Sequence, residues 1–200
     1  MNDTYRFTSW FIQSWSRVGL PLSIILLLLS PFLLKGIGVI LFLVFLQLPV
    51  YMFHQYEEHA HGRFRDFINQ MIGGGKPILS DTAIFWINIL LVWVLDLCIL
   101  YVAAYWNSSL GLIAAYLTLV NGLSHVIVAI VQRRYNPGLW TSIVLFLPFG
   151  GASIVILTMA TQAAILYQVV GLVSAIVVHA IILIYIRRSI HSLKVKEAVE

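Results

Sequence analysis

The chain has 200 residues, of which 60% are hydrophobic and 10% charged, and its mean hydropathy is +0.94. Six separable apolar runs fill this length, which excludes a soluble domain and predicts an all-α, polytopic transmembrane bundle, since the runs are too long and continuous for barrel strands. The formal net charge of +4 comes from basic residues at the ends of these runs, which suits membrane lipid and excludes nucleic acid as a partner.

Residues 1–17 carry aromatic and basic residues at helical spacing, the pattern of an amphipathic segment that lies in the membrane interface. The first span is predicted at about 18–34, and a tight turn at 35–38 leads into the second. We expect the helix of the second span to continue beyond the bilayer to about Met71. It carries the most polar stretch of the chain, His54-Gln55-Tyr56-Glu57-Glu58-His59-Ala60-His61.

Four further spans are predicted at about 83–106, 110–131, 139–158 and 163–186. Ser80 precedes the first of these as a helix N-cap, and Asp96 lies within it. The predicted organisation is therefore an interfacial segment 1–17, a single six-helix domain 18–187 and a basic cytoplasmic tail 188–200.

Positive charge sets the orientation of these spans. With six spans, all but one of the 12 Lys and Arg residues fall on one side of the membrane, and Lys35 alone lies on the other. Basic residues favour the cytoplasmic side, so both termini are predicted to be cytoplasmic.

Three histidines on different spans lie at a similar depth. His54, His125 and His179 each precede an arginine of the cytoplasmic side by eight or nine residues, which is roughly 12–14 Å of helix. At 100° per residue, His54 shares a helix face with Glu57, Glu58 and His61, whereas His59 points away and is expected to be solvated.

Imidazole and carboxylate ligands on neighbouring helices suit Zn²⁺, Fe²⁺ or Mn²⁺, so we predict a divalent metal site. Its ligands are expected among His54, Glu58, His61, His125 and His179. Glu57 or Glu58 would act as the base on a bound water, although the sequence does not say which, and Asn121 would orient an imidazole or a substrate carbonyl. Arg133, Arg134 and Tyr135 are predicted to bind a lipid headgroup or a carboxylate at the cytoplasmic mouth.

These residues predict a membrane-embedded metal-dependent hydrolase that acts on an amphiphilic or lipid-like substrate. An ion- or proton-coupled transporter and a non-catalytic lipid or cofactor binder are the alternatives. Several of these polar residues could instead have a purely structural role. The two glutamates can pair with Arg63 and Arg65, His179 can be a hydrogen-bonded structural residue, and Asp96 can be hydrogen-bonded or protonated.

Three motifs occur in order along the chain: His54-x-x-Glu57-Glu58, Asn121-x-x-x-His125 and Tyr135-x-Pro137-Gly138. Together they resemble the HXXEE family of bacterial membrane proteins over roughly residues 40–185. The resemblance implies that these motif residues are the family's own and that the chain lies in the bacterial cytoplasmic (inner) membrane. It implies no settled function, and it gives no support to His59, His61, Asp96 or His179.

Overall fold

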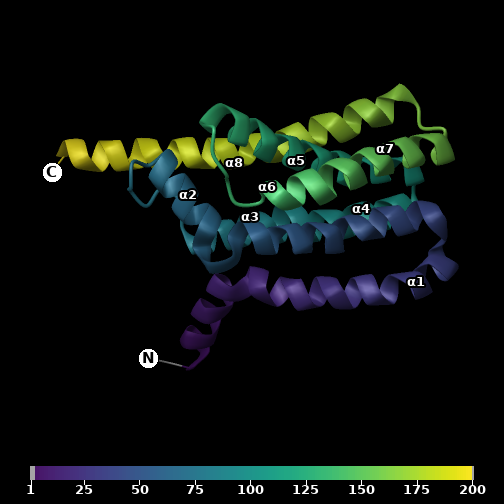
Figure 1. Cartoon of the computed structure of the whole chain (residues 1–200), viewed down its shortest axis with the longest axis horizontal. Helices are drawn as coiled ribbons and strands as arrows, with labels where there is room; N and C mark the ends of the chain where they lie inside the picture. The colour runs from purple at the N-terminus through teal and green to yellow at the C-terminus, as the bar shows by residue number, and fades with distance from the viewer. Residues whose placement is uncertain (1–2, 200) are drawn as a thin grey trace.

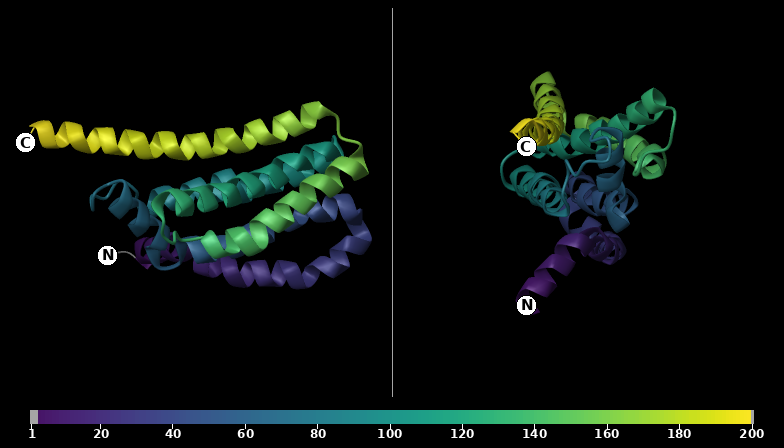
Figure 2. Two further views of the ribbon diagram at one scale, coloured as in Figure 1. Left: turned by 45° about the horizontal axis from the view of Figure 1, so that its top comes forward. Right: turned by 90° about the vertical axis from the view of Figure 1, so that its left-hand side faces the viewer.

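The structure is a computed structural model that describes residues 3–199, and this part of the chain is all-helical without a strand. Five helical segments are long and apolar enough to cross a membrane, and they lie side by side as one bundle (Figures 1 and 2). The segments are Thr4–Met71, Asp81–Tyr105, Ser108–Gln132, Leu139–Thr161 and Ile165–Val195. The predicted all-helical architecture is confirmed, and these five segments are candidates for the predicted membrane spans.

The first helix, α1 (Asp3–His59), folds back on itself at Gly38. This residue has φ 74° and ψ 167°, a conformation that is open to glycine and strained for other residues. Figure 1 shows the two arms of α1 running in opposite directions from this point. Ser23 on the first arm donates a 2.7 Å hydrogen bond to the carbonyl of Pro49 on the second. The turn predicted at 35–38 is thereby confirmed.

The predicted continuation of this helix to Met71 is wrong. The right-handed helix ends at His59, and a short 3₁₀ segment, η1 (Ala60–Gly62), separates it from α2 (Arg63–Met71). His61 and Gly62 have φ values of 60° and 74°, and two successive left-handed residues cannot continue a right-handed helix. The break turns α2 away from the axis of α1 (Figure 1).

Two of the candidate spans, Asp81–Tyr105 and Leu139–Thr161, each contain a π-helical segment. Ser80 caps α3 (Asp81–Asn88) as predicted, accepting a 3.2 Å bond from the backbone of Ala83. The last helix continues through the predicted basic tail to Val199 without interruption. The remaining elements are π-helical η2 (Ile89–Val94), α4 (Leu95–Tyr105), 3₁₀ η3 (Ser108–Gly111), α5 (Leu112–Gln132), α6 (Leu139–Thr141), π-helical η4 (Ser142–Phe146), α7 (Leu147–Thr161) and α8 (Ile165–Val199).

The start of α1 projects from the bundle, as the right-hand view of Figure 2 shows. Tyr5, Phe7 and Trp10 are exposed there, whereas Trp15 is buried and its ring lies 5.2 Å from that of His59. The helix predicted for residues 1–17 is present over its described part, from Asp3, and its interfacial position stays a prediction.

Buried polar side chains join the second arm of α1 to the rest of the bundle. Gln47 is fully buried, accepts a 2.8 Å bond from Thr118 of α5 and donates a 3.0 Å bond to Ser153 of α7. Such bonds hold membrane helices together because the lipid offers no partner to a polar group. These bonds therefore fix the second arm to α5 and α7 about two helical turns before the polar stretch.

The reversal at Gly38 gives a matched pair of substitutions. Gly38→Ala should reduce stability by about 1–3 kcal/mol because alanine is strained at this φ and ψ. Gly36→Ala should be neutral or stabilising, since Gly36 lies in helix and an added Cβ meets no atom within 4 Å at either position. Thermal unfolding in detergent measures both. Equal midpoints for the two variants would contradict the reversal.

Candidate metal centre

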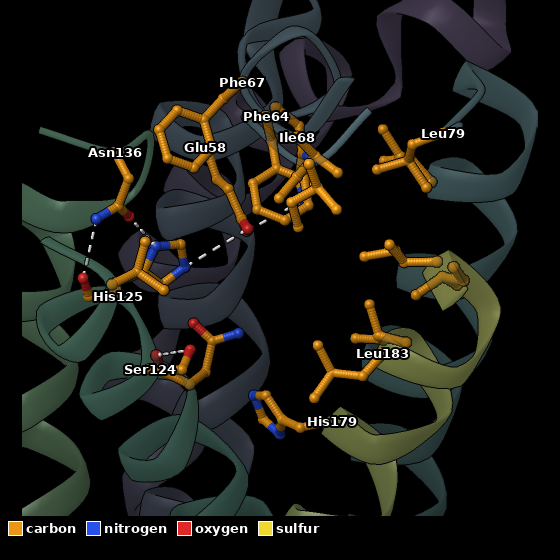
Figure 3. A pocket seen from close by; sticks show the side chains of 18 of the residues that line it. Glu58, Phe64, Phe67, Ile68, Leu79, Ser124, His125, Asn136, His179 and Leu183 are labelled. Carbon is orange, nitrogen blue, oxygen red and sulfur yellow. Dashed lines mark hydrogen bonds and ion pairs between the residues drawn. The ribbon is translucent and has the colours of Figure 1, made fainter. Parts of the chain in front are cut away.

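Two neighbouring turns of α1 and one turn of α5 bring three potential metal ligands together. His54 and Glu58 lie one turn apart on α1, and His125 faces them from α5. The Nε2 atoms of His54 and His125 each lie 3.5 Å from a different carboxylate oxygen of Glu58, and the three residues offer ligand atoms within 4.8 Å of one another. All three are buried, so water does not solvate the carboxylate freely. Figure 3 shows Glu58 and His125 pointing toward each other.

The orientation of the His54 ring is fixed by Thr141. The Thr141 hydroxyl donates to Glu57 Oε2 at 2.5 Å, and its oxygen lies 2.7 Å from His54 Nδ1. Because the hydroxyl proton is already used, Nδ1 of a neutral His54 must donate to it. The lone pair of His54 Nε2 therefore points at Glu58.

Asn136 fixes His125 in the same way. Its amide nitrogen donates a 2.9 Å bond to the backbone carbonyl of His125, which leaves the amide oxygen to accept from His125 Nδ1 at 2.7 Å. The second neutral imidazole thus also presents the lone pair of Nε2 to Glu58.

The Nε2 atoms of His54 and His125 face the Glu58 carboxylate from two helices, an arrangement that a cation stabilises when both rings are neutral. His54 Nε2 has no hydrogen-bond partner in residues 3–199. At bond lengths of about 2.1 Å, tetrahedral ligands of zinc lie roughly 3.4 Å apart, close to the 3.5 Å separations seen here. The donor set fits a divalent ion, and each histidine has the outer hydrogen bond typical of a metal ligand.

His59 is buried beside the cluster, which corrects the expectation that it is solvated and points away. Its Nε2 lies 3.1 Å from Glu58 Oε2, and its ring lies 5.3 Å from that of Phe64. The helical azimuth fails at this residue because α1 ends there, with φ −109° and ψ −15° at His59. His59 is thus a further imidazole on the Glu58 carboxylate.

Glu57 lies outside the cluster and binds the first residues of α6. It accepts from the backbone N–H groups of Trp140 and Thr141, at 3.2 and 2.7 Å, and from the Tyr135 hydroxyl at 2.9 Å. A carboxylate at this position satisfies free amide groups at the beginning of a helix. Partial burial and the neighbouring Glu57 raise the pKa of Tyr135 to about 12, so its hydroxyl remains a donor at physiological pH.

The other predicted site residues are spread over the surface and a neighbouring cavity. His61 is exposed and does not join the cluster. Arg133 and Arg134 are exposed too, and the Arg134 guanidinium lies 5.1 Å from the Phe67 ring centroid. Asn121 and His179 line the cavity. Asp96 is buried on α4, and neither of its carboxylate oxygens has a partner among the described residues.

A cavity of about 260 Å³ adjoins Glu58, His59 and His125. Its polar side chains gather at one end, whereas the other walls are apolar and come from α2, α3, α5 and α8. In Figure 3 Ser124, His125 and Asn136 lie on one side of the cavity and Leu79 and Leu183 on the other, with Phe64 and Ile68 beside Glu58. The apolar lining residues are Phe64, Phe67, Ile68, Met71, Ile72, Leu79, Ile84, Ile87, Val128, Ile182, Leu183 and Ile186.

Gly138 has a packing role that the sequence analysis missed. Its φ is 95°, and an added Cβ would lie 2.8 Å from His125 Cε1 and 2.9 Å from His54 Cε1. Thr141 and Asn136, which orient the two rings, were missed as well. The signal for Asn136 was its position inside the Tyr135-to-Gly138 motif, and no signal in the sequence pointed to Thr141.

One family model matches residues 45–154 of the 200-residue chain, and it is described as a protein of unknown function with an HXXEE motif. The matched range contains the cluster and the residues that orient it, whereas His179 lies outside it. No curated protein and no solved structure matches the chain.

We expect Gly138→Ala to weaken metal binding at least tenfold because the new methyl group displaces both imidazoles. Gly74→Ala is the matched control, since Gly74 is also left-handed, with φ 59°, but has open space around it. Zn²⁺ titration of the two purified variants, after chelator treatment, measures the difference. Equal affinities would show that the close approach of Gly138 does not shape the site.

Proposed function

The chain belongs to the HXXEE family, whose function is unknown, and we propose that it is a membrane-embedded, metal-dependent hydrolase of an amphiphilic or lipid-like substrate. The observation that carries the proposal is that His54 Nε2 and His125 Nε2 each lie 3.5 Å from Glu58, while the Nδ1 atom of each ring is held by an outer partner. Catalytic zinc sites commonly use three protein ligands and keep a further position for water or substrate.

In this proposal His54, Glu58 and His125 hold the ion, whose identity is Zn²⁺, Fe²⁺ or Mn²⁺. When bound, such an ion polarises a substrate carbonyl and lowers the pKa of a bound water. The chain supports its ligands from outside: Glu57 acts through Thr141 on His54, and Asn136 acts on His125. We therefore assign Glu57 to positioning, in place of the catalytic role expected from the sequence, and keep Asn121 beside the substrate.

The cavity supports an amphiphilic substrate. Its polar groups adjoin the cluster, so the bond to be cleaved, an ester or an amide, would lie there, and the alkyl chain would pack against the apolar walls. Hydrolysis would add the hydroxyl of water to the acyl carbon and a proton to the leaving group.

We also propose the membrane arrangement. Because α1 reverses at Gly38, the five helical segments would make six crossings, with both termini cytoplasmic in a bacterial inner membrane. The cluster would then lie toward the cytoplasmic leaflet. There Arg134 lies over the ring of the cavity residue Phe67, and it and the exposed Arg133 could contact a lipid headgroup.

A proton- or ion-coupled carrier is the alternative, and Asp96 is the observation that favours it. This residue is 3% exposed and both of its carboxylate oxygens lack partners within residues 3–199. Buried acids inside membrane helices commonly belong to proton pathways. A binder without catalysis would need neither Asp96 nor the oriented imidazoles.

Elemental analysis of the purified protein tests the metal site. We expect about one transition-metal ion per chain, lost in His54→Ala/His125→Ala and retained in His61→Ala, because only the first two histidines belong to the cluster. Absence of metal from all three proteins, even after reconstitution, would reject the metal-dependent enzyme and favour the proton-coupled carrier.

The adjacent glutamates provide an isosteric pair of variants. Glu58→Gln should lower metal affinity at least tenfold because it removes a charged ligand. Glu57→Gln should retain the ion but lower the unfolding midpoint, since an amide oxygen replaces a carboxylate that accepts four hydrogen bonds. Metal titration and thermal unfolding on the same samples measure both effects. If Glu57→Gln lost the ion and Glu58→Gln retained it, Glu57 would be the metal ligand and Glu58 the positioning residue.

A further inference from the structure

Two buried acceptor atoms in the cavity have no donor. His179 Nδ1 lies 2.8 Å from the Ala175 carbonyl, which can only accept, so a neutral His179 carries its proton on Nδ1 and has a bare lone pair on Nε2. His179 Nε2 and Asn121 Oδ1 are both buried and without a hydrogen-bond partner among the described residues. Such atoms are costly in an apolar environment unless a ligand satisfies them.

These atoms belong to residues that line the same cavity as Glu58 and His125. Asn121 precedes His125 by one turn of α5, so the two side chains share a face of that helix. Figure 3 shows His179 extending from α8 into the cavity, on the side away from Phe64 and Phe67. Asn121 of α5 and His179 of α8 enclose the polar end of the cavity together with the cluster.

The chemistry of this end selects the ligand. Both unpartnered atoms accept hydrogen bonds, and the carboxylate of Glu58 lies in the same wall. A phosphodiester or an ionised carboxylate brings only acceptors and negative charge, so it would leave these atoms unsatisfied. A hydroxyl or an amino group supplies the missing donor.

We propose that Asn121 and His179 form a subsite for the hydroxyl or amino group of an amphiphile whose alkyl chain occupies the apolar part of the cavity. The subsite selects substrates with a hydrogen-bond donor close to the cleaved bond. This assignment rests on the proposed function for the position of that bond, whereas binding of the donor itself needs no metal.

Binding of radiolabelled 1-decanol and decyl methyl ether to the full chain in phosphatidylcholine nanodiscs tests the subsite, with empty discs as the background. The two probes have similar chains, and only the alcohol can donate a hydrogen bond. We expect saturable binding of decanol and binding of the ether at least tenfold weaker. Decylamine in a third arm separates amino from hydroxyl ligands, because the preferred donor binds more tightly.

Substitution of each acceptor tests whether that residue causes the preference for the alcohol over the ether. His179→Phe and, separately, Asn121→Leu should lower decanol binding to the level of the ether. Val177→Phe is the control, because Val177 lies on the same helix with half of its side chain exposed outside the cavity. Equal binding of alcohol and ether to the unaltered chain, or unchanged decanol binding in both variants, would overturn the subsite.

Metal content of the same samples separates this result from the proposed function. Discrimination between alcohol and ether in a chain that binds no metal would keep the subsite and reject the metal-dependent hydrolase. Bound metal without discrimination would keep the metal site and reject the subsite.

Discussion

The carboxylate of Glu58, held out of water among imidazoles, is the interaction on which the rest of this structure depends. A charge within a membrane bundle is costly, and here His54, His59 and His125 lie around it at 3.1 to 3.5 Å. Two of these rings are oriented by further side chains, Thr141 and Asn136, so that the arrangement extends from α1 through α5 to α6. The three motifs of the chain are thus parts of one polar network.

The second arm of α1 organises this network because successive side chains bond to different helices. Gln47 bonds to α5 and α7, whereas Gln55 accepts from the Trp93 indole and donates to Asn88 of α3. His54 lies between these levels, stacked 4.0 Å from the Phe146 ring of π-helical η4. Polar bonds at several depths fix the rotation of this arm, and a fixed rotation is what keeps His54 and Glu58 facing His125.

The helical bundle, the turn at Gly38 and the Ser80 cap could be predicted from sequence because apolar runs, glycine and capping residues act locally. The pairing of His54 and Glu58 followed from helical spacing, and His125 from a comparison of depths. Local sequence patterns do not predict features that depend on contacts between residues distant along the chain. The burial of His59 depends on the left-handed break at His61 and Gly62, and the role of Gly138 depends on two rings from distant helices. The contacts of Thr141 with His54 and of Asn136 with His125 are visible only once the helices are packed.

The order of the residues along the chain has a consequence for biogenesis. In the proposed membrane arrangement, the second arm of α1 is inserted before α5 and its His125 emerge from the ribosome, so Glu58 lacks this partner at that stage. His54 and His59 belong to the same short stretch and both contact the Glu58 carboxylate. The nascent segment thus carries its own polar partners, which lowers the cost of transferring an acidic residue from the translocon into lipid before the bundle is complete.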